Sequence, residues 1–174
     1  MAVEKDSAVV VRSFAFKEAV RIVTFLTPTF GKVGVVARGS RKARSRLSAS
    51  LELFNIGELV FFQKPNRDLH NVNSFDVVEP IGVQLRDHIA VAYASYLAQL
   101  ASDMSLENDA NPPLFYLLRA ALVAVREATT VGALRAVGRC FEAKLLTISG
   151  YRPRLDTCIA CGTPVDDAEV AVGI

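Results

Sequence analysis

Residues 31–46 read GKVGVVARGSRKARSR, from Gly31 to Arg46, and they combine a strand-like segment with a dense run of cations. Its first part, residues 31–37, contains two glycines and several β-branched residues, which is typical of a short strand. Its second part, residues 38–46, carries five cations in nine positions, with no acidic residue and one apolar residue. A second apolar segment, Leu51–Ile56, follows. The pattern predicts an exposed basic loop held between two strands of a sheet.

The partner of such a loop is a polyanion, because clustered cations release counterions from neutralised phosphates without any need for sequence recognition. A charge run that is only a solvated surface loop is the alternative interpretation. The cations of the run are Arg38, Arg41, Lys42, Arg44 and Arg46.

The composition is that of a chain with ordinary packed cores. It has 174 residues, of which 51% are hydrophobic and 22% are charged. No apolar run approaches the roughly 18 residues of a membrane-spanning helix, and the N-terminus is charged, so we expect a cytoplasmic protein. The three cysteines are an odd number, which argues against a disulfide framework.

The excess positive charge belongs to the first half of the chain. Residues 1–80 hold 12 Lys and Arg against 8 Asp and Glu, a balance of +4, whereas residues 81–174 hold 8 against 10, a balance of −2. Eight of the ten Phe precede Pro80, and all four Tyr follow it. We therefore predict two domains, residues 1–80 and residues 81–174.

The first domain is predicted to be a small β-barrel. Five or six short strands with turn residues between them suit a closed barrel, since closure removes exposed sheet edges. The OB-fold is the preferred interpretation and an SH3-like barrel is the alternative. The predicted strands are residues 8–16, 21–26, 31–37, 51–56, 58–63 and 69–78.

The second domain is predicted to be a bundle of three helices, so that the whole chain is of the α+β class. The first helix covers residues 82–104, Asn111 and Pro112 begin the second, and Thr130 caps a third that ends at Gly150. Apolar residues recur every three or four positions in the first helix, and we expect them to form its buried face. They are Leu85, Ile89, Ala92, Tyr93, Tyr96, Leu97, Leu100 and Met104.

Cys158 and Cys161 form a Cys-x-x-Cys pair that is followed by Gly162, which is typical of a zinc knuckle. The pair supplies two ligands where a structural zinc site has four. Redox use of the pair is a weaker interpretation, because it follows a helix and a proline rather than a strand. Cys140 is expected on a helix face.

No enzyme signature is present in the sequence. Gly31-Lys32 lacks the upstream spacing and the following Ser or Thr of a P-loop, and there is no Gly-x-Ser-x-Gly nucleophile elbow. Carboxylates are scattered singly, whereas nuclease chemistry needs them clustered around metal ions. We expect a protein that is not an enzyme.

Several short motifs occur in a specific order along the chain. The N-terminal ones are Val9 to Arg12, Glu18, Ile22 to Thr27, Phe30 to Lys32, Val36 to Gly39 and Arg41 to Leu47. The C-terminal ones are Gly150-Tyr151, Pro153, Leu155, Cys158, Cys161 and Gly162. In this order the chain resembles the RecO family of bacterial DNA repair proteins.

The resemblance implies an N-terminal OB-fold and a helical domain that carries a structural zinc site. It implies binding to single- and double-stranded DNA, annealing of complementary strands, and cooperation with RecR and single-stranded-DNA-binding protein in loading RecA. It implies a nucleoid-associated protein. Family members with the zinc motif continue to a second Cys pair, so the chain looks truncated.

Two sets of site residues follow. The expected DNA-binding residues are the basic run together with outlying cations of the first domain. Exposed Phe side chains would add base stacking, but most Phe, including Phe25, Phe61 and one of Phe14 and Phe16, are expected in the barrel core. The DNA-binding set is Arg38, Arg41, Lys42, Arg44, Arg46, Arg12, Arg21, Lys32, Lys64 and Arg67.

As an alternative function, the helical domain is a docking module for the acidic, apolar tail of single-stranded-DNA-binding protein. The competing interpretation is that its residues are ordinary core. The docking set is Tyr93, Tyr96, Leu97, Tyr116, Arg119 and Arg126.

Overall fold

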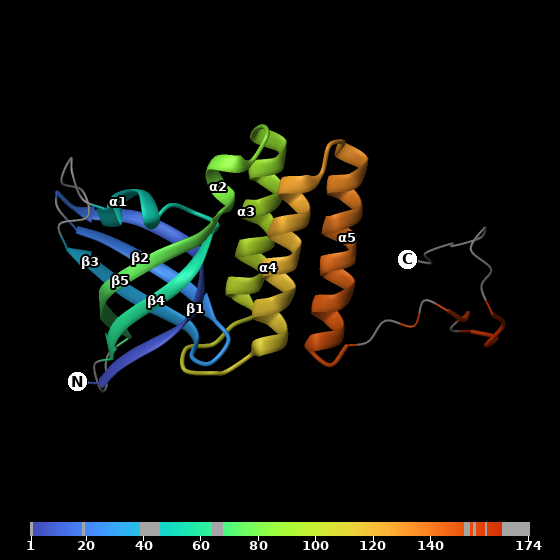
Figure 1. Cartoon of the computed structure of the whole chain (residues 1–174). Coiled ribbons are helices and arrows are strands. Elements are labelled where there is room, and N and C mark those ends of the chain that lie inside the picture. The colour runs from blue at the N-terminus through green and yellow to red at the C-terminus, as the bar shows by residue number, and fades with distance from the viewer. Residues whose placement is uncertain are drawn as a thin grey trace.

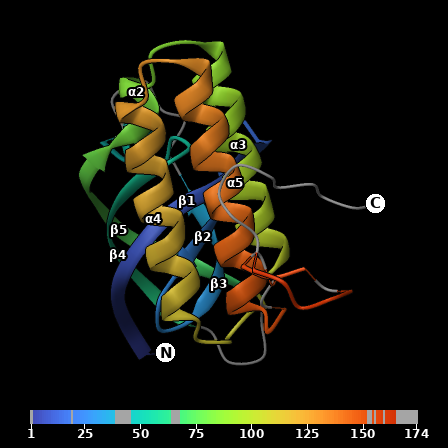
Figure 2. The ribbon, with the colours of Figure 1, turned by 90° about the vertical axis from the view of Figure 1, so that its right-hand side faces the viewer.

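The computed structural model of the chain describes residues 2–18, 20–38, 46–63, 68–151, 154, 156–158 and 160–164. Strands gather on one side of the molecule and helices stand beside them, with α5 furthest from the strands (Figure 1). The view turned by 90° shows α4 and α5 running side by side, with the strands behind them (Figure 2).

The described residues form five strands that close into a barrel in the order β1-β2-β3-β5-β4. All neighbours pair antiparallel except β3 and β5, which pair parallel. This is a five-stranded OB-fold, which confirms the preferred interpretation of the first domain. The strands are β1 (Ala2–Lys17), β2 (Val20–Thr27), β3 (Gly31–Arg38), β4 (Asn55–Gln63) and β5 (Leu69–Pro80).

The barrel interior is filled by alternate residues of its strands. In β3, for example, Val33, Val35 and Ala37 point inward and are almost fully buried. Phe25 and Phe75 meet edge to face inside the barrel, with ring centroids 4.9 Å apart. The alternation places the even-numbered residues of β2 and β3 on the outer surface.

The predicted strand over residues 51–56 is wrong. A short helix, α1 (Arg46–Ser50), precedes a turn, and the strand starts only at Asn55 and continues through Gly57 as β4. Phe54 adopts a positive φ of 68°, which breaks the extended backbone. The Asn55 side-chain amide donates hydrogen bonds to the carbonyls of Ala49 and Ser50, which end α1. The apolar residues Leu51, Phe54 and Ile56 of this segment are all buried, although only its last two residues belong to a strand.

The second and third predicted helices are confirmed. They are α4 (Pro112–Glu127) and α5 (Val131–Ile148). The side chain of Asn111 accepts a hydrogen bond from the Leu114 amide, and Thr130 caps α5 in the same way through the Ala133 amide. Gly150, just beyond α5, has the positive φ expected of a helix terminator.

The first predicted helix is divided into two. α2 (Ile81–Gln84) ends before Asp87, whose carboxylate accepts hydrogen bonds from the amides of Ile89 and Ala90 and so begins α3 (His88–Asp103). The predicted buried face is also partly wrong, because Ala92, Tyr96 and Met104 are exposed. The face that is buried consists mostly of alanines: Ala90, Ala94, Leu97, Ala98 and Ala101.

One side of the barrel shares a hydrophobic core with the helices, while a second cluster of buried side chains fills the barrel interior. A single cluster of buried side chains joins Val9, Leu26 and Ile56 of the barrel to Phe115 and other residues of α3, α4 and α5. The predicted division of the chain at residue 80 stays a prediction. Among the described residues, none of the helices is long and apolar enough to cross a membrane.

The loop between α3 and α4 contacts the barrel at the turn between β2 and β3. The Lys32 amide donates to the Leu106 carbonyl at 3.0 Å, and Gly31 and Lys32 both form bridges with Glu107. A Cβ atom on Gly31 would lie 2.2 Å from the carbonyl oxygen of Asp109, so this close approach requires glycine. The turn between β2 and β3 is therefore held against the helices.

Candidate nucleic-acid interface

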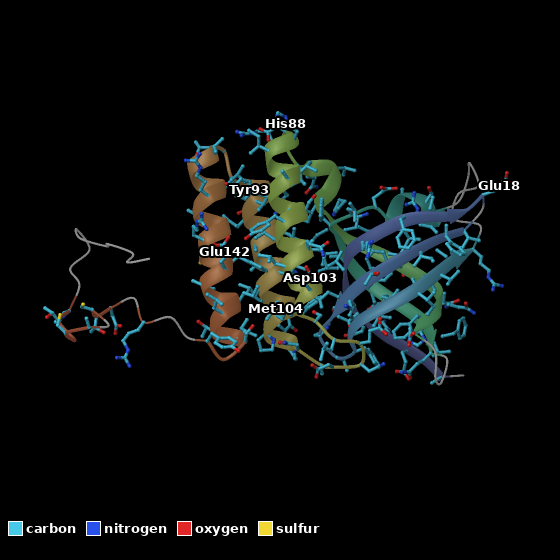
Figure 3. The ribbon with its side chains drawn as sticks, turned by 180° about the vertical axis from the view of Figure 1, so that it is seen from behind. Glu18, His88, Tyr93, Asp103, Met104 and Glu142 are labelled. Atoms are coloured by element: carbon cyan, nitrogen blue, oxygen red, sulfur yellow. The ribbon has the colours of Figure 1, made fainter. Side chains whose placement is uncertain are left out.

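The predicted basic run begins at the barrel end that points away from the helices. β3 starts at Gly31, beside the α3–α4 loop, and ends at Arg38. The seven residues from Lys32 to Arg38, six steps along the strand, span about 20 Å of extended chain. Glu18, which follows β1, lies at this far end (Figure 3). Arg38 is exposed there, and Arg46 is the first residue of α1.

Much of the predicted DNA-binding set lies outside the described residues. Arg38 and Arg12 are exposed and form no ion pair with another described residue. The members outside the described part of the chain are Arg41, Lys42, Arg44, Lys64 and Arg67.

Two members of the predicted set are engaged elsewhere. Arg21 forms an ion pair with Glu52 at 2.9 Å and donates to the Ser48 carbonyl, so its charge is neutralised within the protein. The Lys32 ammonium lies 3.4 Å from the carbonyl oxygen of Ser102, at the helix-facing end of the barrel. The structure thus does not bring Lys32 together with Arg38.

Two aromatic side chains at the far end were not foreseen as a pair. Phe14 and Phe16 are 42% and 58% exposed, although one of them was expected in the barrel core. The Arg12 guanidinium lies over the Phe14 ring, 5.5 Å from its centroid. The sequence signal was alternation, since Arg12, Phe14 and Phe16 occupy every second position of β1. That signal was obscured by the expectation that Phe is buried.

The predicted docking residues do not form one surface. Leu97 is fully buried in the shared core, whereas Tyr93 and Tyr96 line a cavity of about 430 Å³ between α3 and α5. Tyr116 and Arg119 line a different hollow, beside β4 and β5.

The docking arginines form contacts within the protein. Arg119 pairs with Glu79 at 2.7 Å. Arg126 pairs with Glu127 and donates to the side chain of Gln84.

The cavity between α3 and α5 has cationic and anionic walls that sequence reasoning did not select. Arg135, Arg139 and Glu142 of α5 line it together with the two tyrosines, and Tyr93 and Glu142 are labelled in Figure 3. The Tyr96 hydroxyl donates to Glu142 at 2.8 Å, and Arg139 pairs with the same carboxylate at 2.8 Å. These two hydrogen bonds, the first above all, lower the pKa of Glu142, which keeps it ionised.

The Cys-x-x-Cys segment folds as a tight turn. The Cys158 amide donates to the Thr163 carbonyl, and the Gly162 amide donates to the Cys158 carbonyl at 2.8 Å. Gly162 has a φ of +73°, as the knuckle prediction required. The Thr163 hydroxyl lies 3.1 Å from the Cys161 sulfur, and hydrogen bonding from Thr163 lowers the pKa of Cys161 to about 7.

This turn fits one half of a zinc site. Cys161 is exposed and Cys158 is half-buried, and the lowered thiol pKa of Cys161 favours the thiolate that zinc binds. Cys140 is exposed on α5, apart from the turn, and no group of three metal-ligating side chains occurs in the part of the chain that the structure describes. Cys158 and Cys161 would hold the ion, and a complete site needs two further ligands.

These features define the class of protein. The chain is an OB-fold barrel with the exposed cations Arg12 and Arg38 on its far side and a helical bundle packed against it. Comparison with known families narrows the class: residues 1–81 match the model described as recombination protein O N terminal, and residues 85–173 match recombination protein O C terminal. The chain therefore belongs to the recombination protein O (RecO) family, and the resemblance seen in the sequence is confirmed.

Curated relatives agree with this assignment. The chain is 34% identical over 159 residues to the DNA repair protein RecO of Listeria monocytogenes serotype 4b (strain CLIP80459), covering 91% of this chain and 60% of that protein. It is 36% identical over 167 residues to the DNA repair protein RecO of Anaeromyxobacter sp. (strain K), covering 95% and 64% respectively. The chain spans less than two thirds of the length of these relatives.

Proposed function

We propose that this chain binds DNA through the far end of its OB barrel and serves in DNA repair as a mediator of recombination, not as an enzyme. The observation that carries the proposal is the position of Arg38, exposed at the end of β3 and followed at once by the rest of the basic run. Family membership and the names of the relatives support the same role.

The mechanism follows from charge. Cations at one end of a rigid barrel neutralise backbone phosphates of single- or double-stranded DNA and release their counterions, which requires no sequence recognition. Two strands held on one protein repel each other less and meet at a higher local concentration, so annealing proceeds without ATP. The proposed partners, RecR, single-stranded-DNA-binding protein and, indirectly, RecA, rest on the family resemblance, and an association with the nucleoid is proposed on the same ground.

Replacing Arg41, Lys42, Arg44 and Arg46 with Ala tests the proposal. We expect weaker binding to every DNA sequence, and a salt dependence of the binding constant that flattens by roughly 0.9 per lost phosphate contact on duplex DNA. Fluorescence anisotropy at several salt concentrations measures both. The same variant and the wild type, incubated with labelled DNA and Mg²⁺, should leave the DNA uncleaved.

A control with the same change in net charge shows whether position matters. Arg119, Arg126, Arg135 and Lys144 lie on the helices, and their replacement with Ala also removes four positive charges. We expect this variant to bind DNA nearly as the wild type does. Equal losses of affinity and salt slope in the two variants would show that the basic run is not the site.

The cavity between α3 and α5 favours a second candidate function, docking of the tail of single-stranded-DNA-binding protein. Its tyrosine walls suit apolar side chains, and Arg135 and Arg139 can pair with carboxylates of an acidic tail. We expect a tail peptide to bind, and the double replacement of Arg135 and Arg139 with Ala to weaken binding more than Arg126→Ala does. A calorimetric titration that detects no binding to the wild type removes this function.

The zinc assignment is a separate proposal. We infer that Cys158 and Cys161 supply two thiolate ligands to a structural zinc ion. Elemental analysis of the purified protein should show zinc in the wild type and a loss of it in Cys158→Ser and Cys161→Ser, whereas Cys140→Ser retains the metal. Equal metal content in all four proteins would contradict the assignment.

A further inference from the structure

β1 carries two exposed aromatic side chains near its C-terminal end. Phe14 is 42% and Phe16 is 58% exposed, whereas phenylalanines inside the barrel, such as Phe25 and Phe61, are at most 1% exposed. The pairing of β1 with β2 shifts at Phe16, which is a β-bulge directly after the paired residues. Large apolar side chains exposed close to one another in the sequence are candidates for an interaction surface.

The register of the sheet sets the neighbours of Phe14. It pairs with Ile22 of β2, and Ile22 pairs in turn with Val36 of β3. Residues paired across antiparallel strands project from the same face, so these three side chains lie in one row on the outside of the barrel. Ile22 and Val36 are half-buried, which makes them an apolar floor beside the phenyl ring.

Cations border this row on two sides. Arg12 lies two residues before Phe14, and its guanidinium is stacked over the ring. Arg38 lies two residues beyond Val36 on the same outer face and pairs with Val20. Two residues of strand span about 7 Å, so positive charge lies close to the aromatic row both from Arg12 and from Arg38, where the basic run begins.

Aromatic rings interleaved with arginines suit one kind of ligand. Single-stranded nucleic acid offers unstacked bases to the rings and phosphates to the cations, whereas the base faces of a duplex are already stacked on one another. The positive surroundings disfavour a cationic partner and a purely apolar one. The charge of the patch thus complements a single strand of DNA.

We propose that Phe14 and Phe16 are a stacking platform for bases of single-stranded DNA and give the barrel a preference for single strands over duplex. This rests on the proposed function, since the phosphates of the same strand contact the basic run. Arg12 is a positioning residue that fixes the Phe14 ring and contacts the adjacent phosphate. The basic run supplies affinity for both forms of DNA, and the platform discriminates between them.

Phe14→Ala and the double variant Phe14→Ala/Phe16→Ala test the platform. We expect binding to an oligo(dT) strand to weaken about tenfold for each lost base contact, while duplex affinity stays within about twofold and the salt slope is unchanged. Phe14→Leu keeps apolar volume without a flat ring, so it should behave like Phe14→Ala. Val3→Ala changes another exposed apolar side chain of the same strand, 60% exposed, and should bind as the wild type does.

A fluorescent reporter gives an independent reading. The chain contains no Trp, so Phe14→Trp introduces a single indole at the platform. Stacking on bases should quench its fluorescence when oligo(dT) is added, and duplex should quench it much less. Val3→Trp is the matched control and should respond weakly to both.

The outcomes separate this inference from the proposed function. Unchanged single-strand affinity in Phe14→Ala/Phe16→Ala, together with the expected loss in the basic-run variant, overturns the platform and leaves DNA binding in place. Absence of DNA binding by the wild type overturns both. Loss of self-association in the double variant by sedimentation, without a change in single-strand affinity, would show a protein interface and overturn the platform.

Discussion

The two ends of the OB barrel differ in what the protein does with their side chains. At the end facing the helices, barrel residues such as Leu26 and Ile56 are buried together with Phe115 in a common core. At the opposite end, Phe14, Phe16 and Arg38 are exposed. One end of the barrel thus contributes to the stability of the fold, and the other has side chains that are free to contact a ligand. Substitutions at the second end can change binding without weakening the core.

The cations divide in the same way. Arg21 and Arg119 are each paired with a glutamate, whereas Arg12 and Arg38 pair with no acidic residue among those the structure describes. A count of positive charges along the sequence treats all four alike. A cation without an ion-pair partner gains more from contact with a phosphate than one that must give up a carboxylate, so the difference between the two groups predicts which substitutions affect DNA binding most.

The largest expected effect is a loss of stability at the end of the barrel that packs against the helices. Phe115→Ala removes a side chain that is 1% exposed in the shared core, and we expect a loss of about 3–5 kcal/mol in the free energy of unfolding. Because barrel and helices share that core, both should unfold together. Thermal denaturation followed by circular dichroism, with hydrogen exchange of the β2 amides, measures the loss and the cooperativity.

The control for this variant is Val83→Ala, which truncates a side chain that is 79% exposed and should change stability by less than about 0.5 kcal/mol. Protection of the β2 amides that survives melting of the helices would show that the two parts are energetically separate.

A smaller effect is expected where the α3–α4 loop meets the barrel. Gly31→Ala places a Cβ atom against the Asp109 carbonyl and forces a φ of +61° on alanine, which should cost about 1–3 kcal/mol. Gly132→Ala is the matched control, since nothing lies closer than 3.8 Å to its Cβ position and a helical alanine is favoured. Chemical denaturation of both variants compares them. A Gly31→Ala protein as stable as the wild type would mean that the loop does not fasten this end.

The sequence was sufficient to predict those elements whose signals are local. The caps at Asn111 and Thr130 and the stop at Gly150 act within one helical turn, so residue type and spacing identified α4 and α5. The barrel followed from strand lengths and turns. The division at Asp87 was missed because the apolar period continues across it, while the capping carboxylate is a single residue in that pattern.

What could not be predicted depends on contacts between distant segments. The burial of the alanine face of α3 reflects close packing against the barrel and the other helices, which hydrophobicity alone does not rank above tyrosine and methionine. The engagement of Arg21 by Glu52 and the exposure of both Phe14 and Phe16 follow from strand register and from α1. The sequence therefore predicts a candidate site by its charge, but it does not show which phenylalanines are exposed near that site.

Single arginine substitutions test whether paired and unpaired cations differ in their contribution to DNA binding. Arg38→Ala should weaken DNA binding by about 1 kcal/mol and reduce the salt slope by roughly one phosphate contact. Arg21→Ala should leave the slope unchanged, because its charge is already matched by Glu52. Anisotropy titrations over a salt series compare the two, and equal slopes in both variants would remove the distinction.

The smallest expected effect is a pH dependence of stability that arises at Asp87, the residue that caps the start of α3 in the helical part of the molecule. Hydrogen bonds from backbone amides, that of Ala90 first, lower the pKa of Asp87 below its ordinary value of 3.8. A carboxyl group whose pKa is lower in the folded state stabilises the fold at pH values above its unfolded pKa, and this stabilisation is lost as the pH falls through the folded pKa.

Asp87→Asn keeps a cap oxygen for the same two amides but cannot ionise. The melting temperature of the wild type should therefore exceed that of Asp87→Asn slightly at neutral pH, and the difference should shrink between about pH 5 and pH 3. Thr130→Ala, which removes an uncharged cap from α5, should lower the melting temperature by the same amount across that range. A difference between wild type and Asp87→Asn that did not vary with pH would mean that the ionised carboxylate adds nothing to the cap, and that this end of the molecule is held by packing and hydrogen-bond geometry alone.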